Sequence, residues 1–172
     1  MKPFILPLLT AALVAGSAGY AQTVEDIDQR RAALLEAWDK TPLTVRRAIF
    51  VSGDPEGFGM YEARNSNVFK PGEPLMVYAE PAGYGWKDIG NALFEFGFTV
   101  DFAVKSPDRK ILAGQQDFAK LVRQSHVRNL EFMLSLTLNL TGAPAGDYVL
   151  EYTLRDVTGA KSTKFELPFK IS

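Results

Sequence analysis

Strict alternation of apolar and polar residues dominates the second half of the chain. Six apolar residues occupy every second position of residues 94–104, and polar residues such as Glu95 and Thr99 lie between them. Successive side chains of a strand point to opposite faces, so this period predicts a strand with one buried face. Three later segments share the period and are also predicted strands: residues 130–140, 148–154 and 165–171.

Shorter segments in the first half predict further strands. Residues 45–51 and 58–64 are bounded by turn-forming residues, and residues 75–80 are apolar on both faces. Near the C-terminus, Pro168 lies opposite the apolar side of its segment. Because proline cannot donate to a ladder, it predicts an edge strand.

The segment 111–128 fits two patterns. Phe118, Leu121 and Val122 fit one face of a helix. Leu112, however, shares the parity of a strand with Phe118 and Val122. The neighbouring segments are strands, and a sandwich requires one here, so we favour a strand and keep the helix as the alternative.

Residues 22–42 predict a single α-helix that ends at Pro42. Thr23 can cap it, with Asp26 three residues on as the second half of a capping box. Four apolar residues fall on one helical face: Ile27, Leu34, Leu35 and Trp38. We expect this face to pack over one end or edge of the sheet; the alternative is a helix that binds a partner.

Together these segments predict seven to nine strands. Turns rich in glycine and proline separate them, and no helical crossover of the kind that parallel strands need lies between them. We therefore expect a mainly β fold, an antiparallel β-sandwich over residues 43–172 that follows the N-terminal helix.

Residues 1–21 have the layout of a secretory signal peptide. A positive start at Lys2 precedes an apolar run of about 12 residues, and Gly19-Tyr20-Ala21 offers a cleavage site. The run is shorter than the ~20 residues that cross a bilayer. We therefore expect a periplasmic or secreted protein with no membrane span after cleavage.

The charge and composition narrow the function. Nineteen basic and twenty acidic side chains provide no basic excess, so we expect no nucleic-acid partner. The chain has no cysteine and one histidine, His126, which excludes disulfides, thiol nucleophiles and sites that need two histidines. We expect no metal and no cofactor.

Two segments resemble parts of Ig-like and fibronectin-III-like modules of secreted bacterial proteins. Residues 144–150 and the Thr-Gly hairpin that follows are similar to the last two strands of such modules, and residues 67–73 are similar to the start of an early strand. Tyr148, two residues after Gly146, resembles a tyrosine corner. Leu150 stands where many Ig domains carry cysteine. The resemblance implies an Ig-like β-sandwich and no catalytic residue.

Few residues could carry catalysis. Ser125 and His126 are adjacent, and on a strand they would point to opposite faces and not meet. Carboxylates on or beside predicted loops could act in pairs, although spacing alone places no two of them together: Asp54, Glu56, Glu73, Glu80 and Asp88.

The loop of residues 81–90 is the predicted binding site. Tyr84 and Trp86 are flanked by glycines and followed by Lys87, a set that could stack on a sugar ring or hold a peptide. In the alternative, which we favour, the two aromatic rings turn inward and close the end of the core.

These observations predict a non-catalytic exported envelope protein whose β-sandwich binds a protein or peptide partner. One alternative is a carbohydrate- or cell-wall-binding module that uses the Tyr84/Trp86 loop. A further alternative is an enzyme that uses loop carboxylates.

Overall fold

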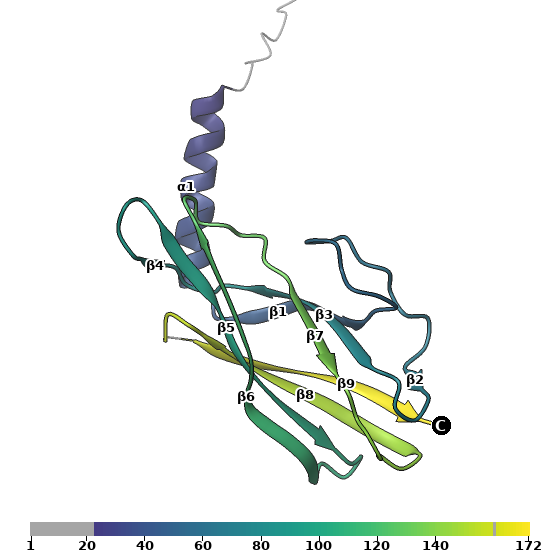
Figure 1. Ribbon diagram of the computed structural model, residues 1–172. Coiled ribbons are helices and arrows are strands. Elements are labelled where there is room, and N and C mark those ends of the chain that lie inside the picture. Colours follow the sequence, from purple (N-terminus) through teal and green to yellow (C-terminus); the bar gives the residue numbers. More distant parts are fainter. Residues whose placement is uncertain (1–22, 160) are drawn as a thin grey trace, which may run out of the picture.

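The computed structural model describes residues 23–159 and 161–172. The predicted signal peptide, residues 1–21, lies outside the described residues. The predicted fold class is confirmed at the level of a mainly β protein, because strands make up 51% of the described residues and one helix precedes them. Figure 1 shows the strands as two sheets and the helix above them.

Nine strands form the two sheets of the described chain. The smaller sheet has three strands in the order β1 (Thr44–Phe50), β3 (Leu75–Ala82) and β7 (Leu134–Leu138). The larger sheet has six, namely β2 (Val68–Phe69), β9 (Ser162–Ile171), β8 (Gly146–Asp156), β5 (Phe94–Lys105), β4 (Lys87–Asp88) and β6 (Ile111–Ser125), the last paired with β5. All pairs are antiparallel except β2 with β9, which is parallel and departs from the predicted pattern.

The alternating apolar residues line the core between the sheets, as the period predicts. On β7, Leu134 and Leu136 are 0% and 2% exposed, whereas Thr137 between Leu136 and Leu138 faces solvent. On β5, Phe98 and Val100 are fully buried. A core drawn from both sheets therefore holds the disulfide-free chain together.

The ambiguous segment is a strand, as favoured. β6 pairs with β5 along nearly its whole length, and the register shifts between Val100 and Phe102. At this irregularity Asp117 has φ 50°, and its backbone N–H donates to Asp101 Oδ1 at 2.7 Å. Irregularities of this kind bend a strand and increase its twist, and the larger sheet is curled into a half-barrel.

Two strand predictions need correction. Residues 58–64 form no strand; they make only isolated bridges, Val51 with Ala63 and Gly57 with Met60. Paired structure in residues 130–140 covers only Leu134–Leu138, because β3 ends its pairing with β7 at those residues. Single side chains of these segments still pack inward: Phe132 is 8% exposed, and the Tyr61 ring lies 4.3 Å from that of buried Tyr78 between centroids.

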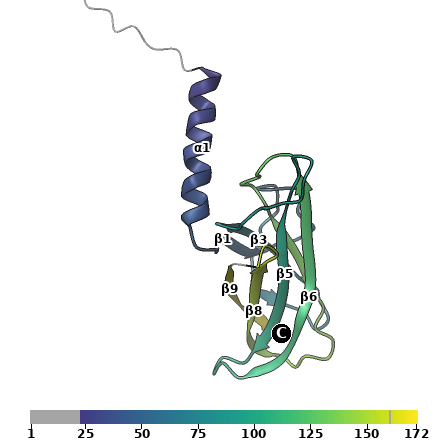
Figure 2. The same ribbon diagram turned by 90° about the vertical axis from the view of Figure 1, so that its left-hand side faces the viewer.

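The helix α1 (Val24–Lys40) begins with the predicted capping box, in which Thr23 and Asp26 satisfy each other's backbone N–H groups. Its packing differs from the favoured prediction. Only Trp38 is buried, and Ile27 and Leu34 are 59% and 51% exposed. Figures 1 and 2 both show α1 extending away from the sheets. The helix is held mainly at its C-terminal end, and Arg31 in its middle adds a long hydrogen bond to Arg128 O at 3.4 Å.

Candidate functional site

The predicted binding loop is largely part of the core. Tyr84 is 0% exposed, its ring stacks on Phe96 with centroids 5.9 Å apart, and its hydroxyl donates to Asn129 O at 2.8 Å. Burial raises the pKa of the Tyr84 phenol. Tyr84 therefore closes one end of the sandwich and offers no surface to a ligand.

Trp86 and Lys87 lie closer to solvent. The Trp86 ring is half-buried and packs on Trp38 at 5.9 Å and on Tyr84 at 5.5 Å between centroids. The Arg128 guanidinium lies 5.9 Å from its centroid. Lys87 is exposed on β4. Of the three predicted site residues, only part of Trp86 and all of Lys87 can reach a ligand, and binding by them stays a prediction.

The end of the sandwich closed by Tyr84 also anchors α1, and we call it the helix socket: Trp38, Gly83, Tyr84, Trp86 and Lys161. Trp38 Nε1 donates to Tyr84 O at 2.8 Å. Lys161 Nζ donates to the carbonyl oxygens of Thr41 at 2.8 Å, Gly83 at 2.7 Å and Asp39 at 3.2 Å. The Asp39 and Thr41 carbonyls lie at the helix C-terminus and its exit, where a cation is favourable, and the Gly83 carbonyl belongs to the loop after β3.

Gly83 makes this close approach possible. Its φ is +78°, and a Cβ on it would lie 2.5 Å from Pro42 O. Any other residue would push the loop away from the helix exit. The loop glycine therefore serves the helix contact, whereas the sequence offered the loop as a binding site.

Asp156 is the buried charge of this end, and reasoning from sequence missed it. It is 4% exposed and accepts hydrogen bonds from Gly85 N at 2.6 Å and Thr158 N at 2.8 Å. It therefore ties the socket loop to the β8–β9 hairpin. An aspartate just before a Thr-Gly turn predicts the local bond from Thr158 N. It gives no sign of the bond from the distant Gly85 N.

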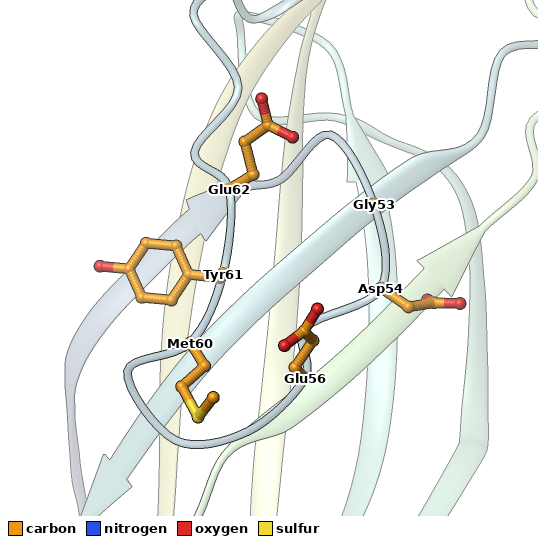
Figure 3. Close-up of a pocket in the computed structure, with 6 residues that line it drawn as sticks. All are labelled: Gly53, Asp54, Glu56, Met60, Tyr61 and Glu62. Atoms are coloured by element: carbon orange, nitrogen blue, oxygen red, sulfur yellow. The ribbon is translucent and has the colours of Figure 1, made fainter.

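The loop carboxylates at the other candidate site diverge. Asp54, Glu56 and Glu62 line a shallow hollow of about 390 Å³ beside Met60 and Tyr61. Figure 3 shows the Asp54 carboxylate pointing away from Glu56, and Glu62 at the other end of the loop from Glu56. Within residues 23–159 and 161–172, no group of three or more such ligands could hold a metal ion.

The remaining candidate carboxylates are separated and engaged elsewhere. Glu73 accepts from Lys70 N at 2.8 Å and pairs with Arg64 at 2.8 Å, and the Lys70 amide is the main cause that lowers the pKa of Glu73. Glu80 accepts from the Tyr78 hydroxyl at 2.8 Å; burial and this carboxylate raise the pKa of Tyr78 to about 12. Asp88 accepts from Gly90 N. The structure brings no two of them together.

His126 lies exposed after β6. Its Nδ1 is 3.0 Å from Ala92 O, and the neighbouring Ser125 hydroxyl accepts from Val127 N at 3.2 Å. The serine and histidine thus serve separate backbone groups.

An apolar hollow that the sequence did not indicate lies on the open side of the sandwich. Its volume is about 560 Å³. We call it the apolar hollow, and its main walls come from both sheets: Phe102, Val104, Leu112, Leu138, Leu140 and Tyr148. Val104 and Leu138 are buried, and Leu112 on the rim is 51% exposed.

Two strand edges border the apolar hollow. In the described chain β6 pairs only with β5, and β7 pairs only with β3. One backbone edge of each strand is therefore free, and residues 111–117 of β6 are all exposed. Free edges present unpaired N–H and C=O groups that can pair with another strand.

Comparison with known proteins provides no identity. No family model matches the chain, and no curated protein matches it. Within the described residues, α1 is neither long nor apolar enough to cross a membrane.

Proposed function

We propose that this chain is an exported, non-catalytic binding protein whose Ig-like β-sandwich takes an extended segment of a protein or peptide partner. The observation that carries the proposal is the apolar hollow beside the free edge of β6. A peptide strand added to this edge gains main-chain hydrogen bonds, and alternate side chains gain apolar contact.

The hollow has properties that suit this role. Its volume of about 560 Å³ falls in the usual range of ligand pockets, about 300–1,000 Å³. Leu112 lies at the rim, next to Ile111, which is 63% exposed. A long edge strand with exposed apolar residues is a surface that proteins normally protect, so its exposure here favours a partner.

The Ig-like part of the proposal rests on Tyr148. Its hydroxyl donates to Pro144 O, four residues upstream, at 2.7 Å. This bond is the geometry of a tyrosine corner, which the sequence resemblance implies. Tyr148 also lines the apolar hollow, so the same residue supports the fold and the proposed site.

Export rests on the pattern of residues 1–21. N-terminal sequencing of envelope material should begin near Gln22. Recovery of the uncleaved chain from the cytosol would refute the periplasmic or secreted location.

Peptide binding is tested by selection from a random peptide library, followed by titration of the selected peptides. We expect peptides with alternating apolar residues, and we expect Leu112→Glu to weaken binding at least tenfold. Met60→Glu is the matched control, since Met60 is 57% exposed and lies in the carboxylate hollow. Equal loss in both variants, or no selected peptide, contradicts the proposal.

The carbohydrate alternative makes the opposite prediction. Binding to a glycan array that Trp86→Ala removes and Leu112→Glu leaves intact would place the site at the aromatic loop. That result would overturn the proposed peptide site.

A further inference from the structure

The projecting part of α1 carries an apolar stripe that nothing in the described chain covers. Val24, Ile27 and Leu34 are 68%, 59% and 51% exposed, three of the nine large apolar side chains exposed in residues 23–159 and 161–172. Monomeric proteins rarely leave apolar residues gathered on one projecting element. We therefore expect a second surface to cover this stripe.

The spacing of the stripe is that of a coiled-coil seam. Val24, Ile27, Arg31, Leu34 and Trp38 follow one another at intervals of three, four, three and four residues. This alternation places the five side chains on one face of the helix. Trp38 ends the seam in the helix socket, so the seam runs outward from the sandwich.

The socket holds the helix in one direction. Trp38 and Lys161 tie its last turn to the loop at Gly83 and Tyr84. Figures 1 and 2 show the remaining turns clear of both sheets. The helix is thus already ordered in the single chain, which lowers the entropy cost of binding a partner.

The charges of α1 point to a protein surface and against a membrane surface. Helices that lie on membranes are rich in lysine and arginine. Here the first two turns are acidic, with Glu25, Asp26 and Asp28, and the basic pair Arg30 and Arg31 follows. This order of charge is complementary to itself when two copies run in opposite directions.

We propose that α1 pairs antiparallel with α1 of a second copy of this chain through Val24, Ile27 and Leu34. A two-fold arrangement that sets Val24 opposite Leu34 of the second copy also sets Ile27 opposite Arg31 of the second copy. Asp28 then lies beside that arginine. An in-register parallel pair would instead place two Arg31 side chains against each other in the seam, which is unfavourable.

The single chain keeps Arg31 available for this role. Its only hydrogen bond within the described residues is a long, exposed one, from Nη2 to Arg128 O at 3.4 Å. Exchange of this bond for a carboxylate partner is favourable. The seam is short, so the pairing should be weak and dependent on concentration.

The first test is sedimentation velocity of the purified exported chain over about a hundredfold range of concentration. The weight-average mass of the wild type should rise from one chain towards two. Ile27→Glu should stay at one chain throughout. Ala33→Glu adds the same charge to the opposite, exposed side of the helix and should follow the wild type.

Circular dichroism checks that both variants keep the helix. A wild type that stays a single chain at every concentration overturns the proposal. Equal behaviour of the two glutamate variants overturns it as well, because the seam would then have no special role.

A charge exchange tests the direction of pairing. Asp28→Arg alone and Arg31→Asp alone should each lower self-association, since each puts like charges together twice. An equimolar mixture should restore it, because in the mixed pair the arginine at position 28 of one variant meets the aspartate at position 31 of the other, and the native Asp28 and Arg31 meet in the second contact. A mixture no more associated than its two components contradicts the antiparallel arrangement. These outcomes do not depend on the peptide site beside β6.

Discussion

The helix socket and the apolar hollow are two apolar regions of one sandwich, and they differ in whether the neighbouring backbone groups have hydrogen-bond partners. In the socket, the backbone carbonyls of Thr41, Gly83 and Tyr84 accept bonds from Lys161 or Trp38. Beside the hollow, one edge of β6 and one edge of β7 have no strand partner in the described chain.

Whether the nearby backbone is paired distinguishes a core region from a candidate binding region better than the types of the residues do. Aromatic residues in a glycine-rich loop suggested a binding site, yet Tyr84 is fully buried there. Leucines in ordinary alternation suggested only a core, yet Leu112 is half exposed on a free edge. Apolar side chains whose neighbouring backbone is satisfied stabilise the fold, whereas those beside an unpaired edge can take a partner.

The largest expected effect is at the socket. Tyr84→Ala removes a fully buried ring and should lower the free energy of unfolding by about 3–5 kcal/mol. Leu112→Ala at the hollow should cost less than about 1 kcal/mol. Guanidinium denaturation of both variants measures the contrast, and similar losses would erase the distinction between the two regions.

The stability of the smaller sheet, which forms one wall of the apolar hollow, should depend on the buried leucines of β7. Leu136 is 2% exposed, and Leu136→Ala should cost about 2–5 kcal/mol, whereas Thr137→Ala should cost under about 1 kcal/mol. Thermal unfolding of the two variants checks the orientation of the strand. A cost at Thr137 as large as that at Leu136 would mean that both faces of β7 are buried.

The attachment of α1 should depend on one lysine. Lys161→Met removes the charged donor of three hydrogen bonds and should cost about 1.5–3 kcal/mol, the range for a hydrogen bond to a charged group. Lys164→Met is the control, since Lys164 is 61% exposed and pairs with Glu151 at 3.3 Å. The control should cost under about 1 kcal/mol. An unchanged free energy of unfolding in Lys161→Met would mean that Lys161 does not anchor the helix and that Trp38 does so alone.

The smallest expected effect is a loss of stability at low pH. It arises from ion pairs that lie outside both regions. The Arg155 guanidinium holds the pKa of Asp101 below its usual value. Burial opposes ionisation of Glu151, yet Lys105 and Lys164 hold its pKa low as well. A lowered folded-state pKa stabilises above the unfolded values of about 3.9 and 4.3, and the stabilisation is lost as pH falls through the folded values.

Asp101→Asn should therefore flatten the fall in stability below about pH 4 while the wild type declines. Urea denaturation at pH 6 and at lower pH measures this difference. An unchanged slope in the variant would show that the Asp101–Arg155 pair makes no contribution.

Sequence alone predicted the parts of the fold that local pattern controls. The Thr23–Asp26 cap, the alternation of β5 and the inward leucines of β7 depend on residues close in the chain. The Tyr148 bond to Pro144 O also spans only four residues. Each of these features has a strong local preference that the tertiary structure follows.

The failures share a different cause. Residues 58–64 had a strand pattern but have no neighbour to pair with, and β2 pairs parallel because of where residues 68–69 meet β9. The contact of Lys161 with Thr41 joins residues 120 positions apart. The apolar hollow likewise needs residues of β5, β6, β7 and β8, so no single segment could reveal it.

Backbone hydrogen exchange, with and without a peptide selected for binding, shows whether a peptide adds to the free strand edges. We expect slower exchange along β6 (Ile111–Ser125) and β7 (Leu134–Leu138), where an added strand would pair with the free edges. Residues 83–88 of the socket loop should exchange at the same rate in both samples. Protection confined to residues 83–88, with β6 and β7 unchanged, would show that the peptide binds at the aromatic loop and not beside the apolar hollow.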